Sequence, residues 1–146
     1  MVALVVFRRG DDELLLVEGY DPVRKLRYLR PPGGGVDFGE LSADAARREV
    51  REELGVDIVD VEQLGILEAI FVNEGQPEHQ IVFVYGARFA DESLFAREAW
   101  DAQESDGEAM KVEWCAVGNL GAETILVPSG LDDLLGLVGQ PKSRKR

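Results

Sequence analysis

The stretch GGGVDFGELSADAARREVREELGV, residues 33–56, decides how this chain is interpreted. Its second half has the pattern of an acidic helix. Positions i, i+3 and i+4 share one face of a helix, with Cβ atoms about 5–6 Å apart, so Glu49, Glu52 and Glu53 are expected to lie together. Like charges at this spacing repel by a few tenths of a kcal/mol per pair. A hard divalent cation such as Mg²⁺ among the carboxylate oxygens would explain the cluster.

The residues before the helix favour this metal-site interpretation. The three glycines allow the backbone to turn sharply or to approach a ligand closely. Asp37 and Glu40 bring further oxygen atoms to the same place, and Gly39 permits a turn directly before the helix. The alternative, which the residues alone leave open, is a solvated helix face whose glutamates are balanced by interleaved arginines.

Hydrophobic periodicity predicts the remaining elements. The stretch Leu41–Leu54 predicts a helix with Ser42 as its N-cap and Gly55 just past its end. Residues Tyr20–Gly35, with three prolines and four basic residues, are expected to be a loop whose cations face an anion. The other predicted elements are strands at Val2–Phe7 and Glu13–Gly19 joined as a hairpin, strands at Asp57–Val72 (interrupted near Gly65), His79–Phe89 and Met110–Val117, a turn at Asn73–Glu78, an acidic loop at Ala90–Ala109 and a helix at Pro128–Gly139.

Intermixed strands and helices predict an α/β fold of the α+β type, in which helices cover both faces of a mixed sheet. A length of 146 residues predicts one domain, residues 1–139, followed by a basic tail, residues 140–146, that is expected to be disordered. No apolar run approaches the ~20 residues that a membrane span needs, and the first residues lack the features of a signal peptide. A cytoplasmic protein without a membrane partner is therefore expected.

Charge and cysteine content exclude several functions. The formal net charge of −12 argues against sequence-independent binding of DNA, which depends on Lys and Arg. It is compatible with a small phosphorylated substrate, because a divalent metal ion supplies positive charge locally. The single cysteine, Cys115, excludes an internal disulfide and a multi-cysteine metal site.

The central stretch closely resembles the signature of Nudix hydrolases. That signature is Gly, five residues, Glu, seven residues, Arg-Glu, an aliphatic residue, any residue, Glu-Glu, any residue, Gly and an aliphatic residue. Every fixed position is present here, namely Gly34, Glu40, Arg48, Glu49, Val50, Glu52, Glu53, Gly55 and Val56. The resemblance implies an α/β/α sandwich with a mixed sheet. It also implies metal-dependent hydrolysis of a nucleoside diphosphate linked to another group, which yields a nucleoside monophosphate and a phosphorylated remainder.

The same resemblance implies roles for individual residues. The metal ligands would be Glu49, Glu52 and Glu53, with Glu40 in the outer coordination of Mg²⁺ or Mn²⁺. Arg48 would pair with one of these glutamates and hold its rotamer, so that Glu52, Glu53 and Arg48 form the catalytic group. Gly34 and Gly35 would give the backbone its shape at the substrate, and Arg30, from the basic segment expected to face an anion, completes the candidate substrate-binding residues.

The general base is open between a glutamate of the signature and one from a later loop. Glu104 and Glu108 lie in a suitable acidic loop before a strand, and Glu108 is the preferred candidate. His79, the only histidine, is interpreted as a strand-edge residue, with contact to a base or phosphate as the alternative. Four aromatic residues could stack on a base, although their strand periodicity favours a place in the core: Phe71, Phe83, Tyr85 and Trp100.

The sequence does not identify the nucleotide. Markers of several Nudix subfamilies, such as a proline about fifteen residues past the signature, are absent. A catalytically weak nucleotide-binding module and an RNA 5′-end pyrophosphohydrolase are the alternatives to a small-nucleotide hydrolase, and the charge of −12 disfavours a long polyanion. Many relatives are dimers, so the resemblance includes a homodimer among the expected assemblies.

Overall fold

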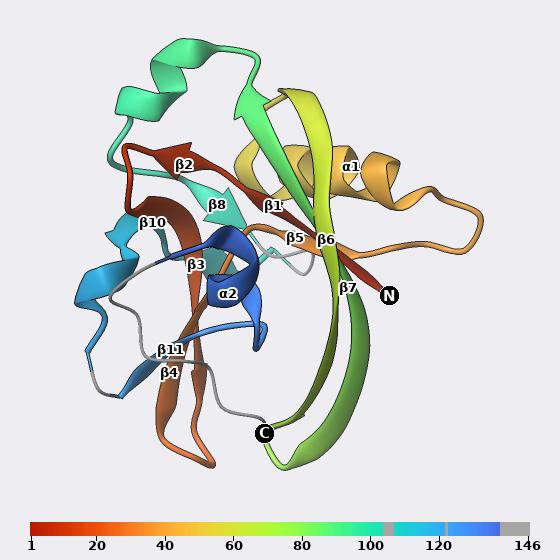
Figure 1. The fold of residues 1–146 in the computed structure, drawn as a ribbon, viewed down its shortest axis with the longest axis vertical. Helices are drawn as coiled ribbons and strands as arrows, with labels where there is room; N and C mark the ends of the chain where they lie inside the picture. Colours follow the sequence, from red (N-terminus) through yellow and green to blue (C-terminus); the bar gives the residue numbers. More distant parts are fainter. Residues whose placement is uncertain (104–106, 122, 138–146) are drawn as a thin grey trace.

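Two mixed β-sheets form the frame of the molecule, and two helices pack against them (Figure 1). The computed structural model describes residues 1–103, 107–121 and 123–137. In chain order the elements are β1 (Val2–Val6), β2 (Arg8–Arg9), β3 (Glu13–Asp21), β4 (Leu26–Arg30), β5 (Gly33–Gly35), α1 (Ser42–Leu54), β6 (Ile58–Asn73), β7 (Gln76–Phe89), the 3₁₀ turn η1 (Glu92–Ala96), β8 (Ala102–Gln103), β9 (Ala109–Met110), β10 (Val112–Ala116), the 3₁₀ turn η2 (Val117–Asn119), β11 (Thr124–Leu126) and α2 (Leu131–Leu135).

The first sheet has the strand order β5–β1–β7–β6. β1 runs antiparallel to β5 and parallel to β7, so that residues 2–6 pair with residues 82–86. β6 and β7 form a long, curved antiparallel hairpin (Figure 1), whose register shifts between Gln63 and Gly65. The interruption expected near Gly65 is therefore a β-irregularity within one strand.

The second sheet has the order β10–β3–β4–β11, with β2 also paired to β3. β11 runs parallel to β4, and the other pairs are antiparallel. β8 and β9 form a separate antiparallel pair. None of the helices in the described part of the chain is long and apolar enough to cross a membrane.

Alternation along the central strands places hydrophobic side chains on both faces. Ala3 and Val5 belong to a cluster that includes Val50 of α1, whereas Leu4 belongs to a second cluster with Leu131 of α2. Because successive side chains of a strand point to opposite faces, a single strand contributes to both clusters. The two helices therefore cover opposite faces, which confirms the predicted α/β class with helices on both sides of mixed strands.

Helix α1 follows its predicted amphipathic pattern. Ala45, Ala46, Val50 and Leu54 are buried, and Gly55 adopts a left-handed conformation with φ of 70°. The Gly55 N–H donates to the carbonyl of Arg51 at 2.9 Å and so completes the last turn.

The predicted N-cap of this helix is wrong. The capping position belongs to Leu41, which makes no side-chain capping hydrogen bond. Ser42 is instead the first helical residue, and its hydroxyl lies 2.5 Å from the Tyr85 hydroxyl on β7. A partner 43 positions away in the chain thus replaces the expected local one.

Three further predictions need correction. The first two strands do not pair as a hairpin, because β1 joins β5 and β7 while the short β2 pairs with β3. The segment predicted as a loop, Tyr20–Gly35, contains β4 and β5, which pair with distant strands. The β6–β7 turn is the tight Glu74–Gly75 pair, with φ of 52° and 82°.

The C-terminal predictions are met only in part. The strand expected at Met110–Val117 is divided between β9 and β10. The last helix covers Leu131–Leu135 rather than Pro128–Gly139, because Gly136 ends it in a left-handed conformation with φ of 66°. The predicted tail, residues 140–146, lies outside the described residues.

Candidate functional site

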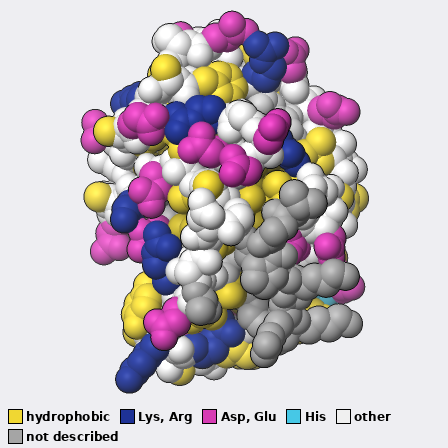
Figure 2. All heavy atoms as spheres, turned by 60° about the vertical axis from the view of Figure 1, so that its left-hand side comes forward, with side chains coloured by type: hydrophobic (Ala, Val, Ile, Leu, Met, Phe, Trp, Pro, Cys, Tyr) yellow, Lys and Arg dark blue, Asp and Glu magenta, His cyan; other side chains and the backbone are white. Residues whose placement is uncertain are grey.

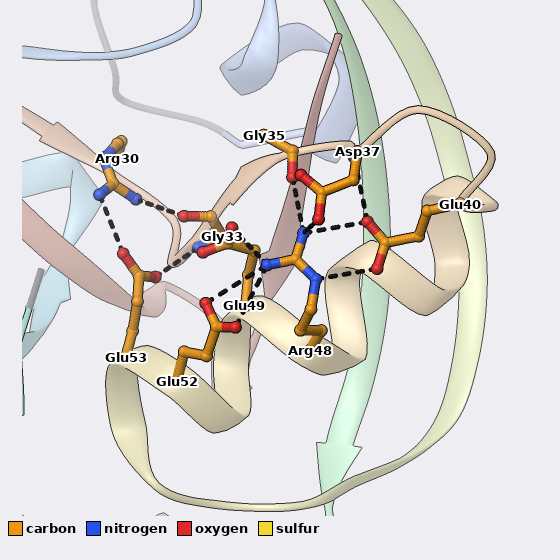
Figure 3. Close-up of polar contacts among 9 residues, drawn as sticks. All are labelled: Arg30, Gly33, Gly35, Asp37, Glu40, Arg48, Glu49, Glu52 and Glu53. Atoms are coloured by element: carbon orange, nitrogen blue, oxygen red, sulfur yellow. Dashed lines mark hydrogen bonds and ion pairs between the residues drawn. The ribbon is translucent and has the colours of Figure 1, made fainter. Parts of the chain in front are cut away.

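The three glutamates of α1 lie in its last two turns and differ in burial. The Glu53 side chain is 7% exposed, that of Glu49 is 15% exposed, and that of Glu52 is 50% exposed. Glu49 and Glu53 lie on the side of the helix that packs against β5, whereas Glu52 faces solvent (Figure 3). The helix therefore presents a row of carboxylates that runs from the protein interior to the surface.

Arg48 lies at the centre of the acidic cluster (Figure 3). Its Nη1 lies 3.0 Å from Glu49 Oε1 and 3.3 Å from Glu52 Oε2. Its Nε donates to Glu40 Oε2 at 2.8 Å, and its Nη2 donates to the Gly35 carbonyl at 2.9 Å. One guanidinium thus joins the glycine strand to the helix and fixes the side-chain positions of several acids.

Glu40 is held by Arg48 through both carboxylate oxygens. Oε1 accepts from Arg48 Nη2 at 2.9 Å and from the Asp37 N–H at 3.1 Å. The guanidinium of Arg48, together with this backbone donor, lowers the pKa of Glu40 to about 2. Glu40 therefore remains ionised and bound to Arg48, which in turn contacts the carboxylates of Glu49 and Glu52.

Glu53 is the buried end of the row. Its Oε1 accepts from the Gly33 N–H at 2.8 Å, and its Oε2 lies 3.3 Å from Arg30 Nη2. Burial raises the pKa of the Glu53 carboxyl above its ordinary value, against the lowering effect of Arg30 and of the Gly33 N–H. Arg30 and the Gly33 N–H therefore only partly offset the cost of burying the negative charge of Glu53.

The glycine strand β5 is shaped around these side chains. A Cβ atom at Gly34 would lie 2.5 Å from the Glu49 carboxylate, and a Cβ atom at Gly33 would meet the carbonyl oxygen of Ala3. At Gly35, by contrast, an added Cβ atom meets no atom within 4 Å. The lack of a side chain thus allows β5 to approach β1 at Gly33 and α1 at Gly34. Gly35 contributes its carbonyl oxygen, which accepts from Arg48.

A cavity of about 350 Å³ opens beside Glu49 and Glu53. Its wall combines the glycine strand, two arginines, aromatic side chains, three polar side chains of the β6–β7 hairpin and several apolar residues. The lining residues are Val2, Leu4, Arg24, Tyr28, Arg30, Gly33, Gly34, Gly35, Glu49, Glu53, Phe71, Asn73, Glu78, Gln80, Val82, Val127 and Pro128.

Asp21 holds Arg24, one of the residues that line this cavity. Its fully buried carboxylate accepts from Arg24 Nε at 2.9 Å and from the Glu74 N–H at 3.3 Å. Burial raises the pKa of Asp21, but hydrogen bonds from the Arg24 side chain and from three backbone N–H groups outweigh it and hold that pKa below its ordinary value. The carboxylate therefore ties the β3–β4 turn to the β6–β7 turn and positions Arg24.

The basic residues expected to face an anion are divided in the structure. Arg24 and Arg30 line the cavity, whereas Arg27 pairs with Glu18 at 2.8 Å and is not among the lining residues. On the face drawn in Figure 2, basic and acidic side chains of the described residues lie side by side. Among the described residues, the basic side chains that line the cavity are those of Arg24 and Arg30.

A second groove, of about 440 Å³, lies between the end of α1 and the β8–β9 pair. Glu52 and Glu53 line one side, and Gln103 and Ala109 line the other. Glu108 directly precedes β9 and is exposed, but it is not one of the described residues that line the groove. Glu104 lies outside the described residues.

Four of the five remaining candidates do not line the cavity beside Glu49 and Glu53. His79 is on the outer face of β7 and lies 2.7 Å from Glu68, so the structure places it away from the lining. Tyr85 and Trp100 are buried in the core, and Phe83 packs against it. Phe71 is the one of the four aromatic candidates that lines the cavity.

Within the described ranges, no group of three or more His, Cys, Asp or Glu side chains converges enough to hold a metal ion. Figure 3 shows why: Glu49 and Glu52 turn toward Arg48, and Glu53 turns toward Arg30. The carboxylate oxygens approach guanidinium groups and remain apart from one another.

Sequence reasoning missed four polar residues of the cavity region: Asp21, Asn73, Glu78 and Gln80. Asp21 lies at the end of β3, in the segment Tyr20–Gly35 that the sequence predicts as a loop. The other three lie in or beside the predicted Asn73–Glu78 turn, where the extended alternation of β6 and β7 was not recognised. A longer period-2 pattern through this hairpin would have identified its inward face.

Comparison with known proteins identifies the family. Residues 1–131 match the NUDIX domain family. A MutT Nudix hydrolase from Burkholderia pseudomallei superimposes with a TM-score of 0.63 and 24% identity, over 94% of this chain and 95% of that one. A Nudix hydrolase from Nitrosomonas europaea gives 0.56 and 21%, over 84% and 75%. A MutT protein from Bacillus halodurans gives 0.58 and 21%, over 97% and 82%. The chain therefore belongs to the Nudix hydrolase family.

Proposed function

We propose that this protein is a metal-dependent nucleotide pyrophosphatase. It would cleave the phosphoanhydride bond of a nucleoside diphosphate linked to another group, giving a nucleoside monophosphate and a phosphorylated remainder. The observation that supports this most strongly is the contact between the glutamate row of α1 and a cavity that also contains two arginines and a glycine strand. Together these groups suit a small, highly charged phosphate ester.

The donor atoms of the α1 glutamates are of the type that binds Mg²⁺ or Mn²⁺. Carboxylate and carbonyl oxygens are the ligands that these hard cations prefer. Glu53 is buried and its pKa is raised by burial, so an added cation would offset a charge that Arg30 only partly balances. Gly34 leaves the space beside the Glu49 carboxylate that any larger residue would fill. We propose Glu49, Glu52 and Glu53 as the metal ligands.

A bound divalent ion would neutralise the diphosphate, polarise its P–O bonds and lower the pKa of a coordinated water. The protein's own residues then divide the remaining work. Arg48 holds the carboxylates of Glu49 and Glu52 in place, and Glu40 in turn fixes Arg48. Glu40 is assigned to the outer coordination because Arg48 binds its two oxygens at 2.8 and 2.9 Å, whereas the contacts of Arg48 with the Glu52 oxygens are longer, at 3.4 and 3.3 Å.

Arg30, Gly34 and Gly35 are the proposed substrate-binding residues. Arg30 lines the cavity directly beside Glu53, where its guanidinium can bind a phosphate oxygen as well as the carboxylate. Arg24, fixed by Asp21 beside the β6–β7 turn, supplies a second cation to the lining of the same cavity. The proton of the attacking water would pass to a carboxylate, either Glu53 or Glu52 of the helix or Glu108 beside the second groove.

A panel of nucleotides tests the proposal. Nucleoside diphosphates linked to sugars, nucleosides or phosphate, and 5′-triphosphorylated RNA, are incubated with Mg²⁺ or Mn²⁺ in ¹⁸O-labelled water, and the products are resolved by mass spectrometry. We expect turnover of a small nucleotide, with label in one phosphate product and no reaction in excess EDTA. Binding without turnover would instead favour a nucleotide-sensing module, and preference for RNA would favour an RNA 5′-end pyrophosphohydrolase.

A further inference from the structure

The cavity has a second end that the hydrolytic groups do not explain. On β6, Phe71 and Asn73 line the cavity, and on β7 Glu78 and Gln80 do the same. Phe71 is the cross-strand partner of Glu78, so their side chains share one face of the hairpin. The intervening residues face outward and are exposed, namely Ile70, Val72, His79 and Ile81.

The polar side chains on this inward face have no hydrogen-bond or ion-pair partner among the residues that the structure describes. Within the described part of the chain, the side chains of Asn73, Glu78 and Gln80 form no hydrogen bond or ion pair, although each is half-buried. On the outer face, by contrast, His79 pairs with Glu68. Partly buried polar groups without protein partners gain most from a ligand that supplies complementary donors and acceptors.

The chemistry of these groups restricts that ligand. An ionised carboxylate accepts hydrogen bonds only, whereas the side-chain amides of Asn73 and Gln80 can both donate and accept. Phe71 and Tyr28 add flat apolar surface to the same cavity, which suits an aromatic ring. A nucleobase meets both requirements, and its hydrogen-bonding edge would face the carboxylate of Glu78.

Among the common bases, guanine places two N–H donors side by side, at N1 and at the N2 amino group. Adenine and cytosine each present one amino group next to an acceptor nitrogen, which an ionised carboxylate repels. Uracil presents a single N–H between two carbonyl oxygens. We propose that the inward face of β6–β7 binds guanine, with Glu78 accepting from N1–H and N2–H and the amides of Gln80 and Asn73 donating to O6 and N7.

This inference rests on the proposed function, because it identifies the substrate of that site as a guanine nucleotide. The positions are consistent with one bound molecule. Arg30 and Glu78 line the same cavity, so one nucleotide can place its phosphates toward Arg30 and Glu53 and its base toward the hairpin. Arg24 lies at the hairpin end, because the Asp21 carboxylate that binds its Nε also accepts from the Glu74 N–H. The cavity of about 350 Å³ lies within the range of ~300–1,000 Å³ that small-molecule sites occupy.

Binding of nucleoside monophosphates tests the inference separately from hydrolysis, since these molecules contain no phosphoanhydride. Isothermal titration calorimetry in Mg²⁺ compares GMP, IMP and AMP on the full chain. IMP lacks only the N2 amino group, so the loss of one charge-assisted hydrogen bond should weaken binding by about tenfold relative to GMP. AMP should bind more weakly than IMP.

The variant Glu78→Gln should reduce the preference for GMP over IMP to less than about threefold, because a neutral amide is a weaker acceptor than a carboxylate. Glu68→Gln, on the outer face of the same hairpin, is the matched control and should keep the preference of the original protein. Equal binding of GMP, IMP and AMP by the unaltered protein, or no binding of any of them, would overturn the inference whatever the hydrolysis panel gives. A Glu78-dependent preference for GMP in a protein that hydrolyses no nucleotide would support guanine binding and refute the proposed hydrolysis.

Discussion

Arg30 of β4 and Glu53 of α1 form an ion pair of 3.3 Å that connects the second sheet to the helix packed on the first. Glu53 also accepts from the Gly33 N–H of β5, so a single carboxylate joins three elements. Its side chain is 7% exposed and that of Arg30 is 23% exposed. Each partner therefore depends on the other for compensation of a partly desolvated charge.

Removing Arg30 should destabilise the protein, because the buried Glu53 carboxylate then loses the cation that balances its charge. Breaking a buried pair on one side costs about 3–5 kcal/mol, and the partial exposure of Arg30 reduces this to about 2 kcal/mol in the free energy of unfolding. Urea denaturation of Arg30→Ala measures the loss. The double variant Arg30→Ala/Glu53→Gln should recover most of it, because no uncompensated charge remains. Simple additivity of the two single variants would contradict the coupling.

The glycine strand offers a matched pair of substitutions. Gly34→Ala places a methyl group 2.5 Å from the Glu49 carboxylate, whereas at Gly35 an added Cβ atom meets nothing within 4 Å. Displacement of Glu49 should lower Mg²⁺-dependent turnover in Gly34→Ala by at least about tenfold more than in Gly35→Ala. Initial rates over a Mg²⁺ titration provide the comparison. Similar rates for the two variants would show that the close approach of Gly34 to Glu49 has no part in turnover.

The ion pair of Glu40 with Arg48 should make stability depend on pH in acid. The folded-state pKa of Glu40 is about 2, below its ordinary value of 4.5. A depressed carboxyl pKa stabilises the fold above the unfolded value, and this contribution is lost as pH falls from about 4.5 to about 2. Melting curves of Glu40→Gln should therefore change less across this window than those of the unaltered protein. Melting temperatures that fall equally with pH in the two proteins would contradict the lowered pKa of Glu40.

Metal binding should raise the melting temperature. A cation between Glu49, Glu52 and Glu53 relieves repulsion in the native state only, and a tenfold excess over Kd adds about 1.4 kcal/mol. For a chain of this size, that corresponds to a rise of about 3–6 °C. Differential scanning calorimetry with Mg²⁺, against NaCl at equal ionic strength, measures it. The variant with all three glutamates changed to glutamine should show no such rise, and a rise that persists in it would place the metal elsewhere.

The sequence predicted best those features that depend on near neighbours. The helix of residues 41–54 was recognised from its apolar stripe and from Gly55, and both signals lie within the helix and its final turn. The spacing of Gly34, Arg48 and the glutamates likewise located the candidate site, because the helix itself brings i, i+3 and i+4 positions together.

The errors concern partners that are distant in the sequence. β1 was expected to pair with the next strand, but its parallel partner β7 lies about 80 positions further on. Ser42 looked like a local N-cap, yet its hydroxyl contacts Tyr85. The pairing of Arg30 with Glu53 and the contact of Asp21 with the Glu74 N–H also require the folded sheets. Local propensity carries no information on such pairings, which tertiary packing decides.

The most direct test of the central claim measures metal-dependent hydrolysis in Glu53→Gln. The control is Glu62→Gln, an exposed glutamate on β6 that does not line the cavity. With the best nucleotide from the panel and saturating Mg²⁺, Glu53→Gln should lose at least about 100-fold in kcat while its circular dichroism spectrum is unchanged. Glu62→Gln should keep the rate of the unaltered protein. A folded Glu53→Gln protein with a rate within about threefold of that value would contradict the assignment of the α1 carboxylates as the metal-binding centre.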